Sequence, residues 1–186
     1  MNNEFFQYPD NELIDLLLDE VNRKKVFEVL VLRYQKQLYW HIRKMVLTHD
    51  DTNDVLQNTL IKIWNGILQF KGESKVFTWM YRIATNESLN FLEQKKRKAY
   101  ASLDDVNLAM LNSLKSDNYF NGDEAAFKLQ AAILTLPEKQ RLVFNMKYFE
   151  EFSYNDMSEI LETSVGALKA SYHHAVKKIE HYLQNN

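Results

Sequence analysis

The sequence has no cysteine and, among its 186 residues, only four glycines and two prolines. Without cysteine the chain can form neither a disulfide framework nor a thiolate metal site, and it has no cysteine nucleophile. Glycine and proline supply most tight turns, and this number is too small for the many turns of a β-sandwich. The sequence therefore predicts a mostly helical protein.

Long apolar runs are also absent. No stretch approaches the roughly 18 apolar residues of a membrane span, and the N-terminus MNNEFFQYPD lacks the basic-then-apolar order of a signal peptide. With 46% apolar and 26% charged residues, we expect a soluble, cytoplasmic protein without membrane insertion. The formal charge of −2 and the pI of 6.2 argue at first against nucleic-acid binding, because nucleic-acid-binding domains are usually basic.

Sequence signatures of catalysis are missing as well. The chain contains no glycine-rich phosphate loop, no HExxH pair and no GxSxG motif. The adjacent His173 and His174 would point about 100° apart on a helix, which is a poor geometry for binding one metal ion. We therefore predict a protein that is not an enzyme and has neither a metal nor a cofactor.

Charge is distributed unevenly along the chain. Residues 1–98 carry 15 basic and 13 acidic side chains, residues 99–124 carry one and five, and residues 125–186 carry seven of each. The acidic middle segment mixes Ser, Asn, Asp and Gly with scattered leucines. It predicts a flexible acidic linker over 99–124 between two small helical domains, 1–98 and 125–186. The 26 linker residues span at most roughly 90 Å when extended.

Helical periodicity of apolar residues supports an all-α fold. After a helix over 27–46 and a break over 48–51, Asp51 and Asp54 resemble a capping box that starts the next helix, followed by a helix over 76–96. In the second domain, Pro137 suits the first turn of a helix that runs to about Glu150. A short helix capped by Ser153 and Asp156, the turn ETS and a final helix over 165–183 have the layout of a helix-turn-helix.

One face of the predicted helix over 76–96 carries the side chains Trp79, Arg82, Asn86 and Asn90, opposite its apolar face. One interpretation is a platform for single-stranded nucleic acid, on which Trp79 stacks against a base, Arg82 meets phosphate and the amides read base edges. The alternative is that Trp79 packs under the preceding loop and the other side chains are solvated. The run Lys95–Lys98 at the helix end is either a solvated face or a contact to the nucleic-acid backbone.

The final helix also has an apolar face and an opposite, outer face. Small residues lie on its outer face near the start, followed by His173, His174, Lys177, Lys178 and His181. Small residues allow a close approach to a groove, and the later donors can meet bases and phosphates. A surface helix with mixed polar residues remains the alternative interpretation.

At this point the sequence resembles the extracytoplasmic-function (ECF) sigma factors, which are promoter-recognition subunits of bacterial RNA polymerase. Four blocks occur in the order of that family: DVLQNTLIKIW (54–64), FKGESKVFTWMYRIATNESLNFL (70–92), LPEKQRLVFNMKYFEEFSYNDMSEIL (136–161) and SVGALKASYHHAVKKI (164–179). The resemblance implies a sigma factor that reads minus-35 duplex and melted minus-10 DNA. It implies core RNA polymerase, promoter DNA and an anti-sigma factor as partners, and a linker that threads toward the polymerase active-site channel.

The resemblance also implies roles for particular residues. Polymerase binding would involve Asp54, Gln57 and Trp64. Asn86 would help to capture a flipped base of the minus-10 element, with Asn90 one turn on and the loop 70–75 covering the pocket. The complete minus-10 set is Trp79, Arg82, Asn86, Asn90, Lys95, Lys96 and Arg97, and the minus-35 set is Lys169, Ser171, His173, His174, Lys177 and Lys178.

The final helix departs from the family pattern at two positions. Where the family often has VKSRLHRA, residues 168–175 read LKASYHHA, so that Ser171 and His174 replace two arginines. This difference predicts weaker minus-35 contact or a preference not led by guanine. Two alternative functions remain: a one-component regulator that uses only its helix-turn-helix, and a structural helical adaptor.

Overall fold

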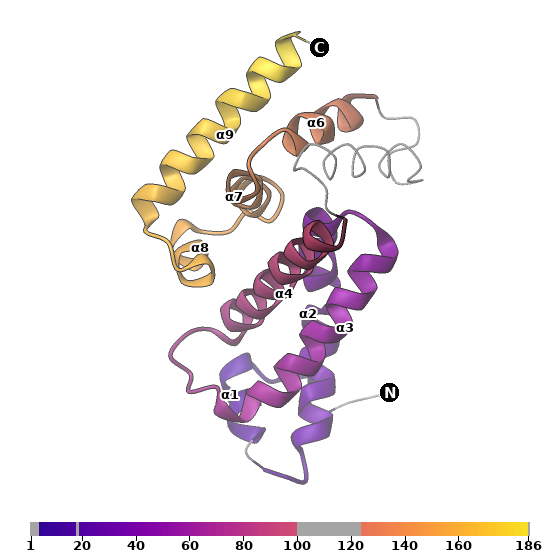
Figure 1. Cartoon of the computed structure of the whole chain (residues 1–186). Helices are drawn as coiled ribbons and strands as arrows, with labels where there is room; N and C mark the ends of the chain where they lie inside the picture. The colour runs from indigo at the N-terminus through magenta and orange to yellow at the C-terminus, as the bar shows by residue number, and fades with distance from the viewer. Residues whose placement is uncertain (1–3, 18, 100–123, 186) are drawn as a thin grey trace.

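The computed structural model describes residues 4–17, 19–99 and 124–185. Every regular element among these residues is a helix (Figure 1), which confirms the all-α prediction. The predicted linker lies outside the described residues except for its ends. We call the described residues from 4 to 99 the N-terminal half and those from 124 to 185 the C-terminal half.

The N-terminal half is built on three long helices that contact one another, α2 (Arg23–Val46), α3 (His49–Gly66) and α4 (Val76–Ala99). The short elements η1 (Glu4–Gln7), α1 (Asp10–Leu16) and η2 (Ile67–Gln69) complete it. Asp10 accepts hydrogen bonds from Arg33 and Tyr34, which ties α1 to α2. The sequence did not predict α1 as a helix.

The junction between α2 and α3 is tighter than predicted. Leu47 adopts a left-handed conformation (φ 68°), and α3 already begins at His49 with Thr48 as its N-cap. The Thr48 hydroxyl accepts a hydrogen bond from the Asp51 amide at 3.2 Å, so Asp51 lies inside the first turn and is not the capping residue. The predicted break between the helices therefore exists, but it covers residues 47–48 and not 48–51, because the left-handed Leu47 ends α2 and Thr48 caps α3.

The C-terminal half contains α6 (Glu124–Leu134), α7 (Glu138–Tyr148), α8 (Tyr154–Leu161) and α9 (Val165–Asn185). Pro137 is the N-cap residue of α7. The Ser153 hydroxyl accepts a hydrogen bond from the Asp156 amide at 3.0 Å, which confirms the predicted cap of α8. Helix α8 is followed by a turn, in which Glu162 is left-handed, and then by α9. This order of elements confirms the predicted helix-turn-helix.

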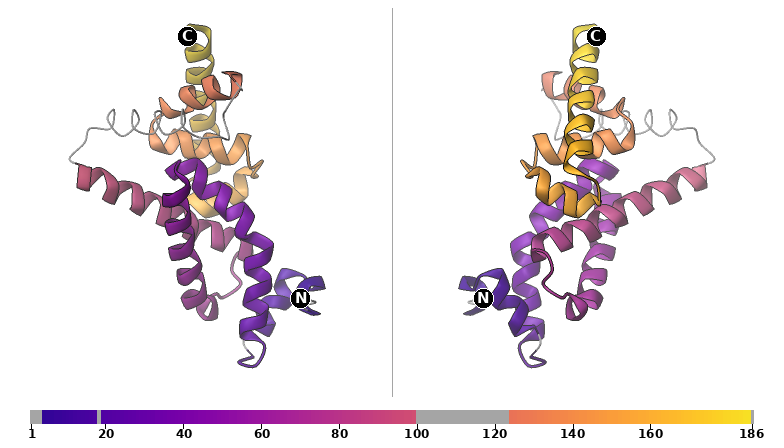
Figure 2. Two further views of the ribbon diagram at one scale, coloured as in Figure 1. Left: turned by 90° about the vertical axis from the view of Figure 1, so that its right-hand side faces the viewer. Right: turned by 90° about the vertical axis from the view of Figure 1, so that its left-hand side faces the viewer.

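The two halves pack against each other, and we call their contact the seam (Figures 1 and 2). Helix α8 lies on α4 and helix α7 contacts α2. At the seam, Phe152 stacks on Phe77 with a centroid distance of 5.3 Å and meets Tyr81 edge-on at 4.9 Å. The apolar core of the N-terminal half thus continues into the C-terminal half, which also has a smaller core of its own around Phe144.

Candidate nucleic-acid interface

The outward face of α4 presents two amide side chains. Asn86 and Asn90 are both exposed and lie one helical turn apart. Neither amide has a hydrogen-bond partner within the described part of the chain. This geometry leaves both carboxamides free to offer paired donors and acceptors to a base.

Trp79 lies on the same helix but is half-buried. Its ring lies 5.2 Å from the ring of Phe70, between centroids, and a Cβ atom added at Gly66 would lie 3.2 Å from its Cζ2 atom. Gly66 therefore leaves the space that the indole occupies. Trp79 thus makes the packing contact with the preceding loop that was one of the two interpretations, and base stacking by Trp79 stays a prediction.

Arg82 points toward the C-terminal half. Its Nη1 atom lies 3.8 Å from a carboxylate oxygen of Glu162, at the end of α8. The Nε atom of Arg82 is buried and has no hydrogen-bond partner among the described residues. The guanidinium that was predicted to meet phosphate is thus next to a carboxylate of the other half.

The cationic run at the end of α4 is paired with acids. Lys95 contacts Asp51 at 2.6 Å, and Arg97 contacts Glu93 at 2.5 Å on the same helix. Lys96 crosses the seam to Glu138 at 2.5 Å. Exposed pairs such as that of Arg97 with Glu93 contribute little to stability, whereas Lys96 and Glu138 are each only about one quarter exposed.

The loop 70–75 borders a cavity of about 540 Å³. Residues of α1 and α2, including Asp10, Asn11 and Tyr34, line it together with Phe70 and Ser74. Asn86 and Asn90 are not among the lining residues. The cavity beside the loop and the two amides are therefore separate features, and their joint action on a flipped base stays a prediction.

Helix α9 carries its predicted residues mostly on an open surface. Lys169, His173, His174, Lys177 and Lys178 are exposed, whereas Ser171 is half-buried. The Lys169 ammonium lies 5.7 Å from the centre of the Tyr154 ring, and Lys178 donates a hydrogen bond to Gln140 at 3.0 Å. The described residues contain no group of three or more His, Cys, Asp or Glu side chains that could hold a metal ion.

The three residues of the predicted polymerase contact lie together on the outer face of α3. Asp54, Gln57 and Trp64 are exposed, and the Trp64 ring packs edge-on against Phe27 at 4.9 Å. Ile61 on the same helix and Leu68 in the following η2 are also exposed, with 51% and 44% of their surface accessible. Two exposed aliphatic side chains beside a tryptophan indicate an interaction surface.

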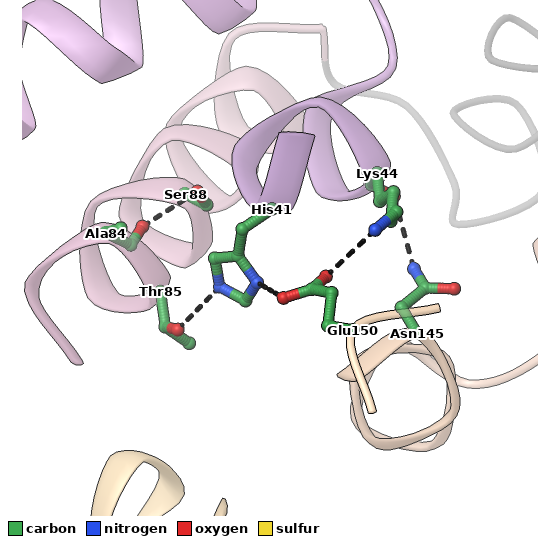
Figure 3. A network of polar contacts seen from close by, with 7 residues as sticks. All are labelled: His41, Lys44, Ala84, Thr85, Ser88, Asn145 and Glu150. Atoms are coloured by element: carbon green, nitrogen blue, oxygen red, sulfur yellow. Dashed lines mark hydrogen bonds and ion pairs between the residues drawn. The ribbon is translucent and has the colours of Figure 1, made fainter. Parts of the chain in front are cut away.

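A buried polar cluster at the seam was not predicted from the sequence (Figure 3). One carboxylate oxygen of Glu150 lies 2.9 Å from His41 Nδ1, and the other lies 3.3 Å from the Lys44 ammonium. The second ring nitrogen of His41 lies 2.9 Å from the Thr85 hydroxyl. Burial alone would raise the pKa of Glu150, but His41 and Lys44 outweigh it and hold the pKa below its ordinary value.

No local sequence signal identifies this cluster. His41 and Glu150 are 109 positions apart and only the packing of the two halves brings them together. A histidine on the otherwise apolar face of α2 was the one available indication, and it did not specify a partner.

Two family models match the chain in the order of its two halves. Residues 30–98 match sigma-70 region 2, and residues 126–179 match sigma-70 region 4. The RNA polymerase sigma-H factor of Pseudomonas aeruginosa is 29% identical over 180 residues, which cover 90% of this chain and 92% of the relative. The ECF RNA polymerase sigma-E factor of Haemophilus influenzae is 29% identical over 186 residues, with 96% and 97% covered.

Solved structures agree with this fold. The sigma factor RpoE of Bartonella quintana, in complex with the anti-sigma factor NepR, has a TM-score of 0.67 at 20% identity and covers 86% of this chain and 98% of its own. CnrH, in complex with the cytosolic domain of CnrY, has a TM-score of 0.69 at 17% identity, and the match covers 95% of this chain and 98% of CnrH. The chain belongs to the sigma-70 family, in its ECF group. It is therefore a sigma factor and not an enzyme.

None of the helices in the described ranges combines the length and the apolar character that crossing a membrane requires.

Proposed function

We propose that this sigma factor directs core RNA polymerase to promoters through a division of labour between its halves. The N-terminal half binds the polymerase and the melted minus-10 element, and the C-terminal half binds the minus-35 duplex. Two long helices, α4 and α9, carry this proposal, because each presents exposed amides or cations on its outer face. The protein then acts in the cytoplasm, where promoter DNA and the polymerase are.

The outer face of α3 and the adjoining η2 supports the polymerase contact. Asp54 and Gln57 give it a polar end, while Ile61, Trp64 and Leu68 give it an apolar end. Apolar side chains flanked by polar ones are typical of protein interfaces. This face lies on different elements from the amides of α4, so that one half can hold the polymerase and DNA simultaneously.

Single-strand binding in the N-terminal half is assigned to Asn86 and Asn90, supported by Trp79, Arg82, Lys95, Lys96 and Arg97. One tryptophan recovers only about 1–3 kcal/mol of stacking energy per base, which is less than melting several base-pair steps costs. The polymerase must therefore supply most of the energy that keeps the DNA open.

Minus-35 binding is assigned to the outer face of α9, with Lys169, Ser171, His173, His174, Lys177 and Lys178. Histidine is a weak cation near neutral pH, so we expect modest affinity of the free protein for duplex DNA. The solved structures of RpoE and CnrH hold NepR and CnrY. By analogy, we propose that an anti-sigma factor binds this chain too.

Run-off transcription with core polymerase over a library of bacterial promoters tests the proposal. We expect transcripts that depend on the added protein, and stable, near-stoichiometric recovery of polymerase in a pull-down. A one-component regulator would bind DNA without retaining the polymerase, and a structural adaptor would support no promoter-dependent transcription. Either of these results would overturn the proposal.

A further inference from the structure

A second cavity lies at the seam, and we call it the seam cavity. It has a volume of about 550 Å³, and residues of both halves line it. Its walls come from α2, from the first turns of α4 and from the segment 149–152 between α7 and α8. Cavities that bind small molecules commonly have volumes of roughly 300–1,000 Å³. The seam cavity is thus large enough to hold an organic molecule.

Aromatic side chains make up most of the lining. Five of the nine lining residues are aromatic, namely Trp40, Phe77, Tyr81, Phe149 and Phe152. Phe77 lies 4.5 Å from Tyr81 and 5.3 Å from Phe152, between ring centroids, so these three rings form one packed wall. Trp40 and Phe149 keep 36% and 40% of their surface exposed. Such a lining favours a planar aromatic compound, because aromatic rings pack well against one another.

One residue of this wall, Tyr81, has an unused hydrogen-bonding group. Only 3% of its surface is exposed, yet its hydroxyl makes no hydrogen bond to any described residue. A buried tyrosine hydroxyl usually has a partner. Burial and the nearby Glu150 carboxylate raise the pKa of Tyr81 well above its ordinary value, so that the hydroxyl keeps its proton. It can therefore donate a hydrogen bond to an acceptor that a ligand brings into the cavity.

The charged side chains of the lining favour an acceptor that is anionic. Lys36 is exposed and makes neither an ion pair nor a hydrogen bond within the described residues. The Lys44 ammonium lies 3.3 Å from a carboxylate oxygen of Glu150 and 5.3 Å from the centre of the Phe149 ring. Glu150 is also held by His41 (Figure 3). Two lysines against one glutamate leave an excess of positive charge, and Lys44 already takes the place over Phe149 that a cationic ligand would use.

The cavity beside the loop 70–75, which we call the loop cavity, allows an internal comparison. Its volume of about 540 Å³ is nearly the same, but its charged lining is different. Asp10 and Asp15 line it, and Lys75, the one cation among its described lining residues, contacts Asp156 at 3.1 Å. We therefore expect an anionic compound to prefer the seam cavity over the loop cavity.

We propose that the seam cavity binds a small aromatic carboxylate, with its ring against the aromatic wall and its oxygens toward the Tyr81 hydroxyl and the Lys36 ammonium. The chain then has a small-molecule ligand in addition to its macromolecular partners. Because both halves line the cavity, the bound compound contacts both of them. The inference does not rest on the proposed function, since neither α9 nor the amides Asn86 and Asn90 are part of the described lining.

Three compounds with the same ring system and different charge test the class of ligand: 2-naphthoate, the neutral 2-naphthamide and the cationic 2-naphthylmethylammonium. Isothermal titration calorimetry of the full-length chain at constant salt measures each affinity. We expect saturable binding of 2-naphthoate, about three- to tenfold weaker binding of the amide and still weaker binding of the ammonium compound. The proposal is overturned by equal affinity for all three compounds, by a preference for the ammonium compound, or by no saturation with 2-naphthoate up to about 5 mM.

Paired variants locate the binding site. Tyr81→Phe removes only the hydroxyl, and Lys36→Gln removes only the charge. Their controls are Tyr148→Phe and Lys24→Gln, which change an exposed tyrosine and an exposed lysine outside the cavity. We expect about three- to tenfold weaker binding of 2-naphthoate for Tyr81→Phe, about threefold weaker binding for Lys36→Gln and no change for the controls. Equal affinities of Tyr81→Phe and Tyr148→Phe would contradict the assigned site. Because Lys36 is exposed, its variant keeps the test valid should Tyr81→Phe fail to fold.

A further variant, Asp15→Asn, distinguishes the two cavities, because it removes an exposed acid from the loop cavity alone. Binding in the seam cavity predicts that this variant has the affinity of the natural sequence for 2-naphthoate. A gain of affinity from Asp15→Asn without a loss from Tyr81→Phe would place the compound in the loop cavity and overturn the proposal.

Amide chemical shifts show which elements the bound compound contacts. With 2-naphthoate at saturation, we expect shifts along 36–44 in α2, around Tyr81 in α4 and in the segment 149–152. Shifts confined to one half would contradict a site that both halves build. These measurements are made without DNA or polymerase, so failed run-off transcription would refute the proposed function and leave the test of the seam cavity unaffected.

Discussion

The two helices assigned to DNA present their polar side chains in opposite settings. On α9, the histidines and lysines of the outer face are exposed to solvent. On α4, Trp79 is packed beside Phe70, while Arg82 and Lys96 are paired across the seam. Asn86, Asn90, Lys95 and Arg97 of the α4 set are also exposed, but Lys95 and Arg97 are paired with Asp51 and Glu93. Only the two amides are therefore exposed without a partner among the described residues.

This difference shows that a cationic side chain on a predicted DNA-binding face is not always free. On α9 the cations are exposed, whereas on α4 the packing of the two halves decides which side chains reach solvent. Helix α9 projects from the C-terminal half, whereas α4 forms part of the seam (Figure 2). A near-neutral protein can therefore carry exposed cations on α9, because part of its acidic charge lies in the middle segment and part is paired with cations at the seam. The net charge of −2 is an average that hides this arrangement.

The largest expected effect comes from the aromatic contact that joins the halves. Phe152→Ala removes a buried ring beside Phe77 and Tyr81 and should lower the free energy of unfolding by about 3 kcal/mol. Phe144→Ala, in the smaller core of the C-terminal half, should cost a similar amount. Urea unfolding measures both values.

Hydrogen exchange distinguishes these two variants. Phe152→Ala should raise the exchange of backbone amides in the first turns of α4, because it loosens the seam, whereas Phe144→Ala should affect α7 and α9. Unchanged exchange in α4 for Phe152→Ala would mean that the halves are independent in solution.

The next largest effect is expected for Trp79. Packing of its ring against Phe70 predicts a loss of stability on substitution, whereas stacking on a DNA base predicts a loss of promoter opening. Trp79→Ala should destabilise the protein by about 2 kcal/mol because it leaves a gap beside Gly66 and Phe70. Trp79→Phe should recover most of this stability. If the indole also stacks on a base, permanganate footprints will show poorer promoter opening for Trp79→Ala with polymerase binding retained.

The fold was largely predictable because local signals specify it. Helical periodicity found the long helices, and the pair Ser153 and Asp156 located α8 correctly. The seam was not predictable in the same way, because Glu150 meets His41 only after two distant segments pack. The helical wheel likewise placed Asn86 and Asn90 outward correctly, but it could not show that Arg82, on the same side, faces an acid of another helix.

A smaller effect is expected for an exposed amide of α4. Asn86→Ala should leave the unfolding midpoint unchanged, because the side chain is exposed and makes no hydrogen bond within the described residues. It should reduce discrimination at one position of the minus-10 element by about 1–2 kcal/mol, as expected for loss of a paired contact to a base edge. Transcription from promoters with single-base changes measures this loss, and an equal loss on every promoter would indicate a structural role instead.

The smallest effect is expected on α9, where the family arginines are replaced. His174→Arg adds a permanent charge on an exposed position and should strengthen duplex binding by about 1 kcal/mol, with a steeper salt dependence by about one phosphate contact. Ser171→Arg should gain less, because Ser171 is half-buried and its replacement must first reach the surface. Titration of fluorescent promoter duplexes at several salt concentrations measures both slopes. If the two variants gained equal affinity for the duplex, the place of the arginine on the helix face would not decide its contact with DNA. The outer face of α9 would then bind DNA through its total charge alone.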